Sequence, residues 1–182
     1  MSLSIVHTRA ALGVNAPAIT IEVHISNGLP GLTMVGLPET TVKEARDRVR
    51  SAVINSGYEF PAKKITINLA PADLKKEGPA FDLAIALGIL TASEQLSWAH
   101  PESFLVIGEL SLSGEIRSVN GVLPMVLAAK EAGIANILVP FDNRHEAAVV
   151  QNVNVYPVKD FHEAVSFLKQ ELVIDPFMIN LD

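Results

Sequence analysis

The side chains of this sequence that could carry chemistry are mainly cations. Lys43, Arg46 and Arg50 follow one another at spacings of three and four residues, which places them on one side of a helix. Two further lysines, Lys63 and Lys64, are adjacent in the sequence. Cations arranged in this way can contact consecutive phosphates of a nucleic-acid backbone or the acidic surface of a protein. The five residues are therefore candidates for nucleic-acid binding.

The same cations also have a plainer explanation. Glu39, Glu44 and Asp47 lie close to them in the sequence, and exposed helical cations commonly pair with carboxylates or simply face water. The formal net charge of −6 argues against a surface that binds nucleic acid over its whole area. Residues 1–76 contain nine Lys or Arg and six Asp or Glu, whereas residues 77–182 contain five and fourteen. Any basic surface must therefore be local and belong to the first half of the chain.

Motifs of the common catalytic and cofactor sites are absent from the sequence. It contains no G-x-x-x-x-G-K-[ST] phosphate loop, no G-x-G-x-x-G after a strand, no H-E-x-x-H and no G-x-S-x-G. Cysteine is absent, and the five histidines are scattered. Asp73 and Asp82 could hold a cation, although a carboxylate near a helix start is more simply explained by the helix dipole. We therefore expect no metal site, no cofactor and no ATP hydrolysis by this chain.

The element that must organise the fold is an apolar run that follows Gly78 and Pro79. Proline is well suited to the first turn of a helix, and nearly every position of residues 80–90 is apolar. A helix on the surface would show a polar side, and this run has none. The sequence therefore predicts a central helix that is covered on most sides.

Shorter patterns predict the other elements. Alternating or apolar runs indicate strands, and residues 108–117 read as strand, turn and strand with the turn at Ser113 and Gly114. Thr41 and Glu44 match a capping box, Pro124 is expected to open a helix, Asp142 or Asn143 to cap a short one and Asp160 to cap the last. The strands are predicted at residues 4–10, 18–26, 32–35, 65–69, 104–107, 137–140 and 153–158.

These elements predict a mixed α/β (α+β) fold. Strands dominate the first part and alternate with helices later, which favours one domain over residues 1–170, followed by a tail or the start of a linker at 171–182. No apolar run is long enough to cross a membrane, and the first residues lack the pattern of a secretory signal. Together with the lack of cysteine, this suits a cytoplasmic protein without a membrane partner.

Two regions resemble the proteolytic domain of Lon proteases. Residues 77–83 and the apolar helix resemble the Gly-Pro-Ser-Ala-Gly helix of that family, and residues 108–119, 126–133 and 139–140 resemble the sequence that follows it. The resemblance implies a Lon-like fold, with a mixed sheet and a buried central helix. It also places the serine of the Lon catalytic pair at Ala80 and the lysine at about Leu123. Both positions are apolar here, so the resemblance implies a domain without catalytic residues.

A more extensive resemblance is to the N-terminal domain of the magnesium-chelatase-like AAA+ family, which includes ComM and YifB. It is carried by residues 18–26, 28–31, 35–39, 43–50, 68–74 and 108–110, and it covers residues 1 to about 170. The resemblance implies that an AAA+ module follows, which would bind ATP and magnesium, and that the full-length protein is a homo-hexameric ATPase. It further implies a role in DNA branch migration during natural transformation, in which this domain engages DNA or helps to assemble the ring.

Two other functions remain open at the level of the sequence. A protein-interaction module would need no special residues, so the sequence is compatible with one. A serine peptidase with a displaced nucleophile would have to use a turn serine such as Ser111 or Ser113, which lacks a neighbouring His or Lys in the sequence.

Overall fold

The structure is a computed structural model that describes residues 2–72, 74, 76 and 78–179. Its first part is a four-stranded sheet of β1 (Ser2–Arg9), β2 (Ala18–Ser26), β3 (Gly31–Val35) and β4 (Lys64–Ala70). The strand order is β1-β2-β4-β3, with β3 parallel to β4 and the other pairs antiparallel. The predicted alternation is confirmed in β2, where Ile19, Ile21, Val23 and Ile25 are buried. One side of the sheet therefore supplies much of the core.

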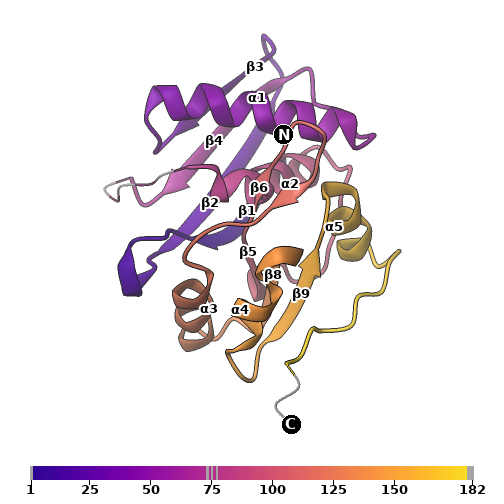
Figure 1. Ribbon diagram of the computed structural model, residues 1–182. Helices are drawn as coiled ribbons and strands as arrows, with labels where there is room; N and C mark the ends of the chain where they lie inside the picture. The colour runs from indigo at the N-terminus through magenta and orange to yellow at the C-terminus, as the bar shows by residue number, and fades with distance from the viewer. Residues whose placement is uncertain (1, 73, 75, 77, 180–182) are drawn as a thin grey trace.

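Two helices cover that side of the sheet. Helix α1 (Glu39–Asn55) lies across one end of the molecule, and α2 (Asp82–Ala92) packs between α1 and strands β1 and β2 (Figure 1). A short 3-10 turn, η2 (Pro79–Phe81), precedes α2. Every residue of α2 except Thr91 is buried, so the predicted central helix is confirmed. Gly88 lets it approach the sheet closely, since a Cβ there would lie 2.7 Å from Cγ2 of Val23.

The second part of the chain builds a parallel sheet of β5 (Phe104–Val106), β8 (Asn136–Pro140) and β9 (Asn154–Val158), in the order β5-β8-β9. A small hairpin pairs β6 (Glu109–Leu110) with β7 (Ile116–Arg117). The described strands thus form three sheets, of which the four-stranded one is mixed, as expected. The remaining elements are η1 (Gly13–Asn15), η3 (Pro101–Ser103), α3 (Val122–Glu131), η4 (Phe141–Asn143), α4 (Arg144–Ala148) and α5 (Phe161–Leu168).

Helix starts depart from the sequence prediction at several points. Helix α1 begins at Glu39 directly after Pro38, so Thr41 lies inside its first turn and the predicted capping box is wrong. Helix α3 begins at Val122 after Gly121, two residues before Pro124. Because the backbone geometry of Pro38 and Gly121 sets the starts of these two helices, Thr41 and Pro124 are ordinary first-turn residues.

The two predicted polar caps of the last helices have different outcomes. Asn143 does precede α4 but makes no cap hydrogen bond, because its side chain bonds the backbone of Val119 instead. Asp160 does cap α5, where its Oδ1 accepts from the amide of Glu163 at 2.8 Å.

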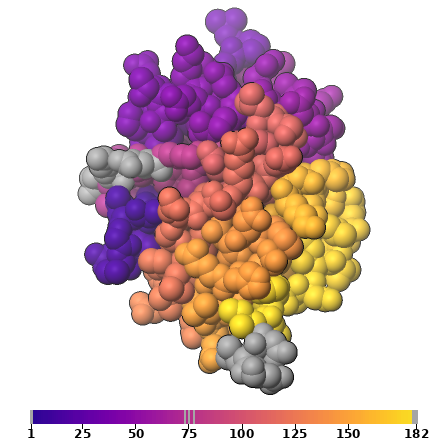
Figure 2. Space-filling view, in the orientation of Figure 1, coloured from indigo at the N-terminus to yellow at the C-terminus, as the bar shows by residue number. Residues whose placement is uncertain are grey.

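Most of the first part of the chain lies around α1, and β8, β9 and α3 to α5 lie on the other side of the molecule, but η1 lies beside α3 and α2 packs with the first sheet. Figure 2 shows the purple atoms around α1 above and the orange and yellow atoms of the second half below. The segment after α5 runs along the outside of β9 (Figure 1), and the amide of Phe177 donates to the carbonyl of Val155 at 2.8 Å. None of the described helices is long and apolar enough to cross a membrane.

Candidate functional site

The cations of α1 face outward because the apolar residues of this helix form one stripe. Lys43 and Arg50 are exposed and Arg46 is half-buried, as expected for residues outside the buried stripe of Ala45, Val49, Ala52 and Val53. The helix therefore presents three of the five candidate cations to solvent, which agrees with the spacing in the sequence.

Lys43 and Arg46 border a groove between α1 and the edge strand β3. The groove has a volume of about 630 Å³. Its apolar lining consists of Leu32, Met34, Leu37 and Val42. The polar and charged lining residues are Thr33, Glu39, Thr40, Lys43 and Arg46. Arg50 lies outside this groove, and its guanidinium stands 6.0 Å from the centre of the Phe60 ring.

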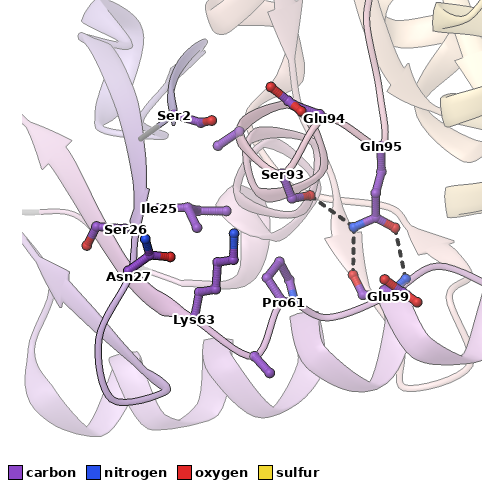
Figure 3. A pocket seen from close by; sticks show the side chains of 12 residues that line it. Ser2, Ile25, Ser26, Asn27, Glu59, Pro61, Lys63, Ser93, Glu94 and Gln95 are labelled. Carbon is purple, nitrogen blue, oxygen red and sulfur yellow. Dashed lines mark hydrogen bonds between the residues drawn. The ribbon is translucent and has the colours of Figure 1, made fainter.

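The two lysines of the β4 region are separated from the helix cations and from each other. Lys64 is exposed at the start of β4, opposite Ser26 of β2 and Gly31 of β3. Lys63 instead lines a hollow of about 480 Å³ between the end of α2, the end of β2 and the segment before β4. Figure 3 shows its amine directed into this hollow.

The hollow around Lys63 is lined by two carboxylates, and hydrogen bonds connect several of its lining residues. Glu59 and Glu94 are among its lining residues, so the charge of Lys63 is partly offset there. The Gln95 amide donates to the carbonyl of Glu59 at 2.8 Å and to Ser93 at 2.9 Å, and its oxygen accepts from the amide of Glu59 at 2.9 Å (Figure 3). The structure thus divides the five candidates among a groove, an exposed helix side, a hollow and the exposed start of β4.

Arg48, which lies between the candidate cations Arg46 and Arg50 in the sequence, is turned inward. Its Nε donates to Oδ2 of Asp82 at 2.7 Å and its Nη2 to Oδ1 at 3.1 Å. The amide of Leu110 donates to the same carboxylate at 3.1 Å. The helix dipole is therefore not the main explanation of Asp82, because this carboxylate has a bidentate partner on α1. Arg48 was detectable in principle, since it lies three residues after Ala45 and four before Ala52, beside the apolar stripe.

The ion pair is titratable within an ordinary pH range. Burial raises the pKa of Asp82 from 3.8 to about 6, although the hydrogen bonds from Arg48 and Leu110 and the charge of Arg48 oppose the shift. The hydrogen bond to Asp82 raises the pKa of Arg48 above its ordinary value. Asp82 is thus held by a permanent cation and is unavailable to an external ligand.

Ala80 lines a cleft of about 370 Å³ at the start of α2. Its carbonyl accepts from the amide of Gly108 at 3.1 Å, and the amide of Leu83 donates to the carbonyl of Gly108 at 3.0 Å. The cleft brings together η2, the start of β6 and the segment before α3, through Ala10, Ala11, Leu12, Gly78, Pro79, Glu109, Ser118, Val119 and Asn120. Leu123 packs against an apolar cluster that includes Leu105, Val126 and Val139, and its amide donates to Glu146 at 2.8 Å.

The serines of the β6–β7 turn bond to each other and to the backbone. The hydroxyls of Ser111 and Ser113 are 3.1 Å apart, and Ser111 accepts from the amide of Glu115 at 3.0 Å. Among the residues that the structure describes, no group of three His, Asp or Glu side chains is arranged to hold a metal ion. Asp73, the other carboxylate considered for a cation, lies outside the described residues.

Comparison with known proteins places the chain in a family. Residues 21–143 match the family described as subunit ChlI of Mg-chelatase. The chain is 61% identical to the uncharacterized protein YifB of Salmonella typhimurium over 93% of its own length and 33% of that protein. It is 53% identical to the competence protein ComM of Haemophilus influenzae, over 92% of this chain and 33% of ComM.

A more distant relative is consistent with the resemblance to Lon proteases. Lon protease of Leptospira interrogans is 27% identical to the chain, over 88% of this chain and 20% of the protease. The chain spans about a third of the length of the YifB and ComM relatives. From the match over residues 21–143 and these two close relatives, the chain belongs to the magnesium-chelatase-like ChlI family, as a ComM-like member.

Proposed function

We propose that this chain is the N-terminal domain of a ComM-like AAA+ ATPase that promotes DNA branch migration in natural transformation. The proposal is supported by the family match and by the identity of 53% to a protein named for competence. An AAA+ module beyond this chain would bind ATP and magnesium, and the full-length protein would act as a homo-hexamer. Residues 1–170 would form one domain, with residues 171–182 leading toward that module.

Within this assembly, the domain engages DNA through the exposed cations near α1. The observation that carries this assignment is the packing of α1, which buries Ala45 and Val49 and leaves Lys43 and Arg50 in solvent. Phosphate contacts need only accessible cations at roughly regular spacing, and they carry no sequence information. Lys43, Arg46 and Arg50 supply the helix contacts, and Lys63 and Lys64, which lie apart from them, would supply further contacts elsewhere on the DNA.

The domain itself performs no peptide hydrolysis in this proposal. The position that corresponds to the serine of Lon carries Ala80, and the position that corresponds to its lysine carries Leu123. A methyl group cannot attack a carbonyl carbon, and an isobutyl group cannot accept a proton. Treatment with a serine-reactive phosphonate tests this point, and the expected result is an unlabelled chain.

DNA binding is tested by fluorescence anisotropy with a labelled duplex at several salt concentrations. Each phosphate contact is expected to add roughly 0.9 to the slope of log affinity against log salt. The variant Arg46→Glu/Arg50→Glu should lose binding, whereas Lys130→Glu, an exposed cation of α3, should retain it. Unchanged binding by the double variant would exclude this helix surface as the DNA site.

The role in branch migration is tested in the full-length protein. We expect removal of residues 1–170 to reduce branch migration more than ATP turnover, since the proposed motor lies outside this domain. Equal rates with and without the domain would contradict the proposal.

A protein-interaction role is favoured by one separate observation, which is the groove beside Lys43 and Arg46. Its apolar lining has no use in binding phosphates. The two roles share Lys43 and Arg46, so a partner seated in the groove would leave Arg50, which lies outside it, as the helix cation free for DNA.

A further inference from the structure

The groove between β3 and α1 combines features that suit an extended polypeptide. Strand β3 pairs with β4 alone among the described residues, so its other edge leaves main-chain donors and acceptors available. Leu32, Leu37 and Val42 provide an apolar lining. Lys43 and Arg46 provide two positive charges against the single carboxylate of Glu39. An exposed strand edge commonly binds an extended peptide as an added strand. Alternate side chains of that peptide then contact the apolar lining of the groove.

A segment with matching properties lies in the second half of the same chain. Residues 171–175 read Glu-Leu-Val-Ile-Asp and connect α5 to the anchored Phe177. The side chain of Val173 is 86% exposed and that of Leu172 38% exposed, which is unusual for consecutive aliphatic residues in a folded domain. Both flanking acids, Glu171 and Asp175, are also exposed.

The main chain of this segment is partly unused. Within the described residues, the amides of Val173, Ile174 and Asp175 make no hydrogen bond, whereas the amides of Glu171 and Leu172 both donate to the carbonyl of Ser166 and the amide of Phe177 donates to that of Val155. An extended segment with free amides can donate to the carbonyl groups of a strand edge.

We propose that the groove between β3 and α1 receives residues 171–175 of a second copy of this chain. Val173 contacts the apolar lining, and the carboxylates of Glu171 and Asp175 face Lys43 and Arg46 of the neighbour. This contact deepens the proposed function, on whose ring assembly it rests, by assigning the surfaces through which neighbouring domains meet.

Charge distribution favours a second copy as the occupant. The groove belongs to residues 1–76, where cations exceed carboxylates by nine to six, and the segment belongs to residues 77–182, where carboxylates exceed cations by fourteen to five. The groove lies between β3 and α1, whereas the segment follows α5, in a different region of the molecule (Figure 1). Copies of such a molecule attract one another head to tail, and a head-to-tail contact generates a ring when its rotation closes.

The contact is tested first by sedimentation velocity of the chain at low salt. The wild-type chain is expected to associate as its concentration rises toward about 1 mM, and added salt should weaken the association. The variants Val173→Asp and Lys43→Glu/Arg46→Glu should remain monomeric over the same range. The matched control Arg50→Glu/Lys64→Glu changes the net charge by the same amount outside the groove and should associate like the wild type.

A charge exchange makes the test independent of simple loss of folding. Lys43→Glu/Arg46→Glu and Glu171→Lys/Asp175→Lys should each be monomeric alone, whereas an equimolar mixture should associate, because each groove then meets a segment of opposite charge. The chain has no cysteine, so Thr40→Cys and Val173→Cys in separate copies should also form a mixed disulfide.

Several outcomes would overturn the proposal. A wild-type chain that stays monomeric up to about 1 mM, or a mixture of the two charge variants that stays monomeric, excludes the contact. If Lys43→Glu/Arg46→Glu lowers affinity for DNA and leaves sedimentation unchanged, the groove cations serve DNA and the contact is wrong. Loss of DNA binding in Arg50→Glu/Lys64→Glu bears only on the DNA role, so the two proposals fail separately.

Discussion

Arg48 of α1 holds the carboxylate of Asp82, the first residue of the buried helix α2, through two hydrogen bonds of 2.7 and 3.1 Å. The Asp82 side chain is 1% exposed and that of Arg48 22% exposed, so the ion pair is largely buried between α1 and α2. The pair therefore links α1 to α2, while the apolar stripe of α1 determines which of its cations reach solvent.

Removal of Arg48 should destabilise the fold strongly. Arg48→Met keeps most of the aliphatic volume but leaves the Asp82 charge buried without its partner, and breaking a buried pair in this way costs roughly 3 kcal/mol. The measurement is the free energy of unfolding in urea. Arg50→Met, which alters an exposed cation of the same helix, should change it by less than about 0.5 kcal/mol.

A second substitution checks the cause of that loss. Arg48→Met combined with Asp82→Leu removes both charges, and the double variant should be more stable than Arg48→Met alone. Equal stability of the two variants would show that the lost packing of the arginine stem, rather than the unpaired carboxylate, accounts for the effect.

Titration of Asp82 should give a distinctive pH dependence of stability. Because burial raises the pKa of Asp82 to about 6 from 3.8, the folded protein binds this proton more tightly than the unfolded chain does. The contribution of Asp82 to stability is therefore fully present below pH 3.8 and is lost as the pH rises through about 6.

The measurement is urea unfolding of the wild type and Asp82→Asn across this pH range. The difference between their free energies of unfolding should fall with rising pH, by at most about 1.4 kcal/mol per pH unit for one proton. A difference that rises instead would mean that Arg48 outweighs burial and lowers the pKa.

The close approach of α2 to the sheet predicts an unusual response at Gly88. Alanine normally stabilises a helix interior by about 1 kcal/mol relative to glycine. At Gly88, the new Cβ would lie 2.7 Å from Cγ2 of the buried Val23, so Gly88→Ala should cost roughly 1–3 kcal/mol of unfolding free energy. Gly31→Ala, where no atom lies within 4 Å of the added Cβ, serves as the control and should be tolerated.

The anchor of the C-terminal segment should respond locally. Phe177 packs edge-on against His145 at 4.9 Å between ring centres, and its amide bonds to Val155. Phe177→Ala should accelerate hydrogen exchange of the Phe177 position and its neighbours while leaving the amides of α2 protected, because local opening needs less free energy than global unfolding. Met178→Ala, at a side chain that is 83% exposed, should leave exchange unchanged.

Local patterns in the sequence predict elements better than they predict partners. The alternation of β2, the apolar run of α2 and the cap at Asp160 each express an interaction within a few residues, and the structure confirms them. The capping box at Thr41 and the helix start at Pro124 are wrong, because Pro38 and Gly121 set the starts of these helices. A weak local signal fails where a neighbouring residue has the stronger backbone preference.

The amino-acid sequence by itself determined that α2 would be the covered centre of the fold and that α1 would carry its cations on one side, because both depend on periodicity along a single helix. Only the tertiary structure decided that Arg48 faces inward and forms an ion pair with Asp82, 34 residues later in the sequence. It also decided that Lys63 is separated from the helix cations. Hydrophobic periodicity determines which side of a helix is buried, but a partner distant in sequence is chosen by the packing of the whole chain.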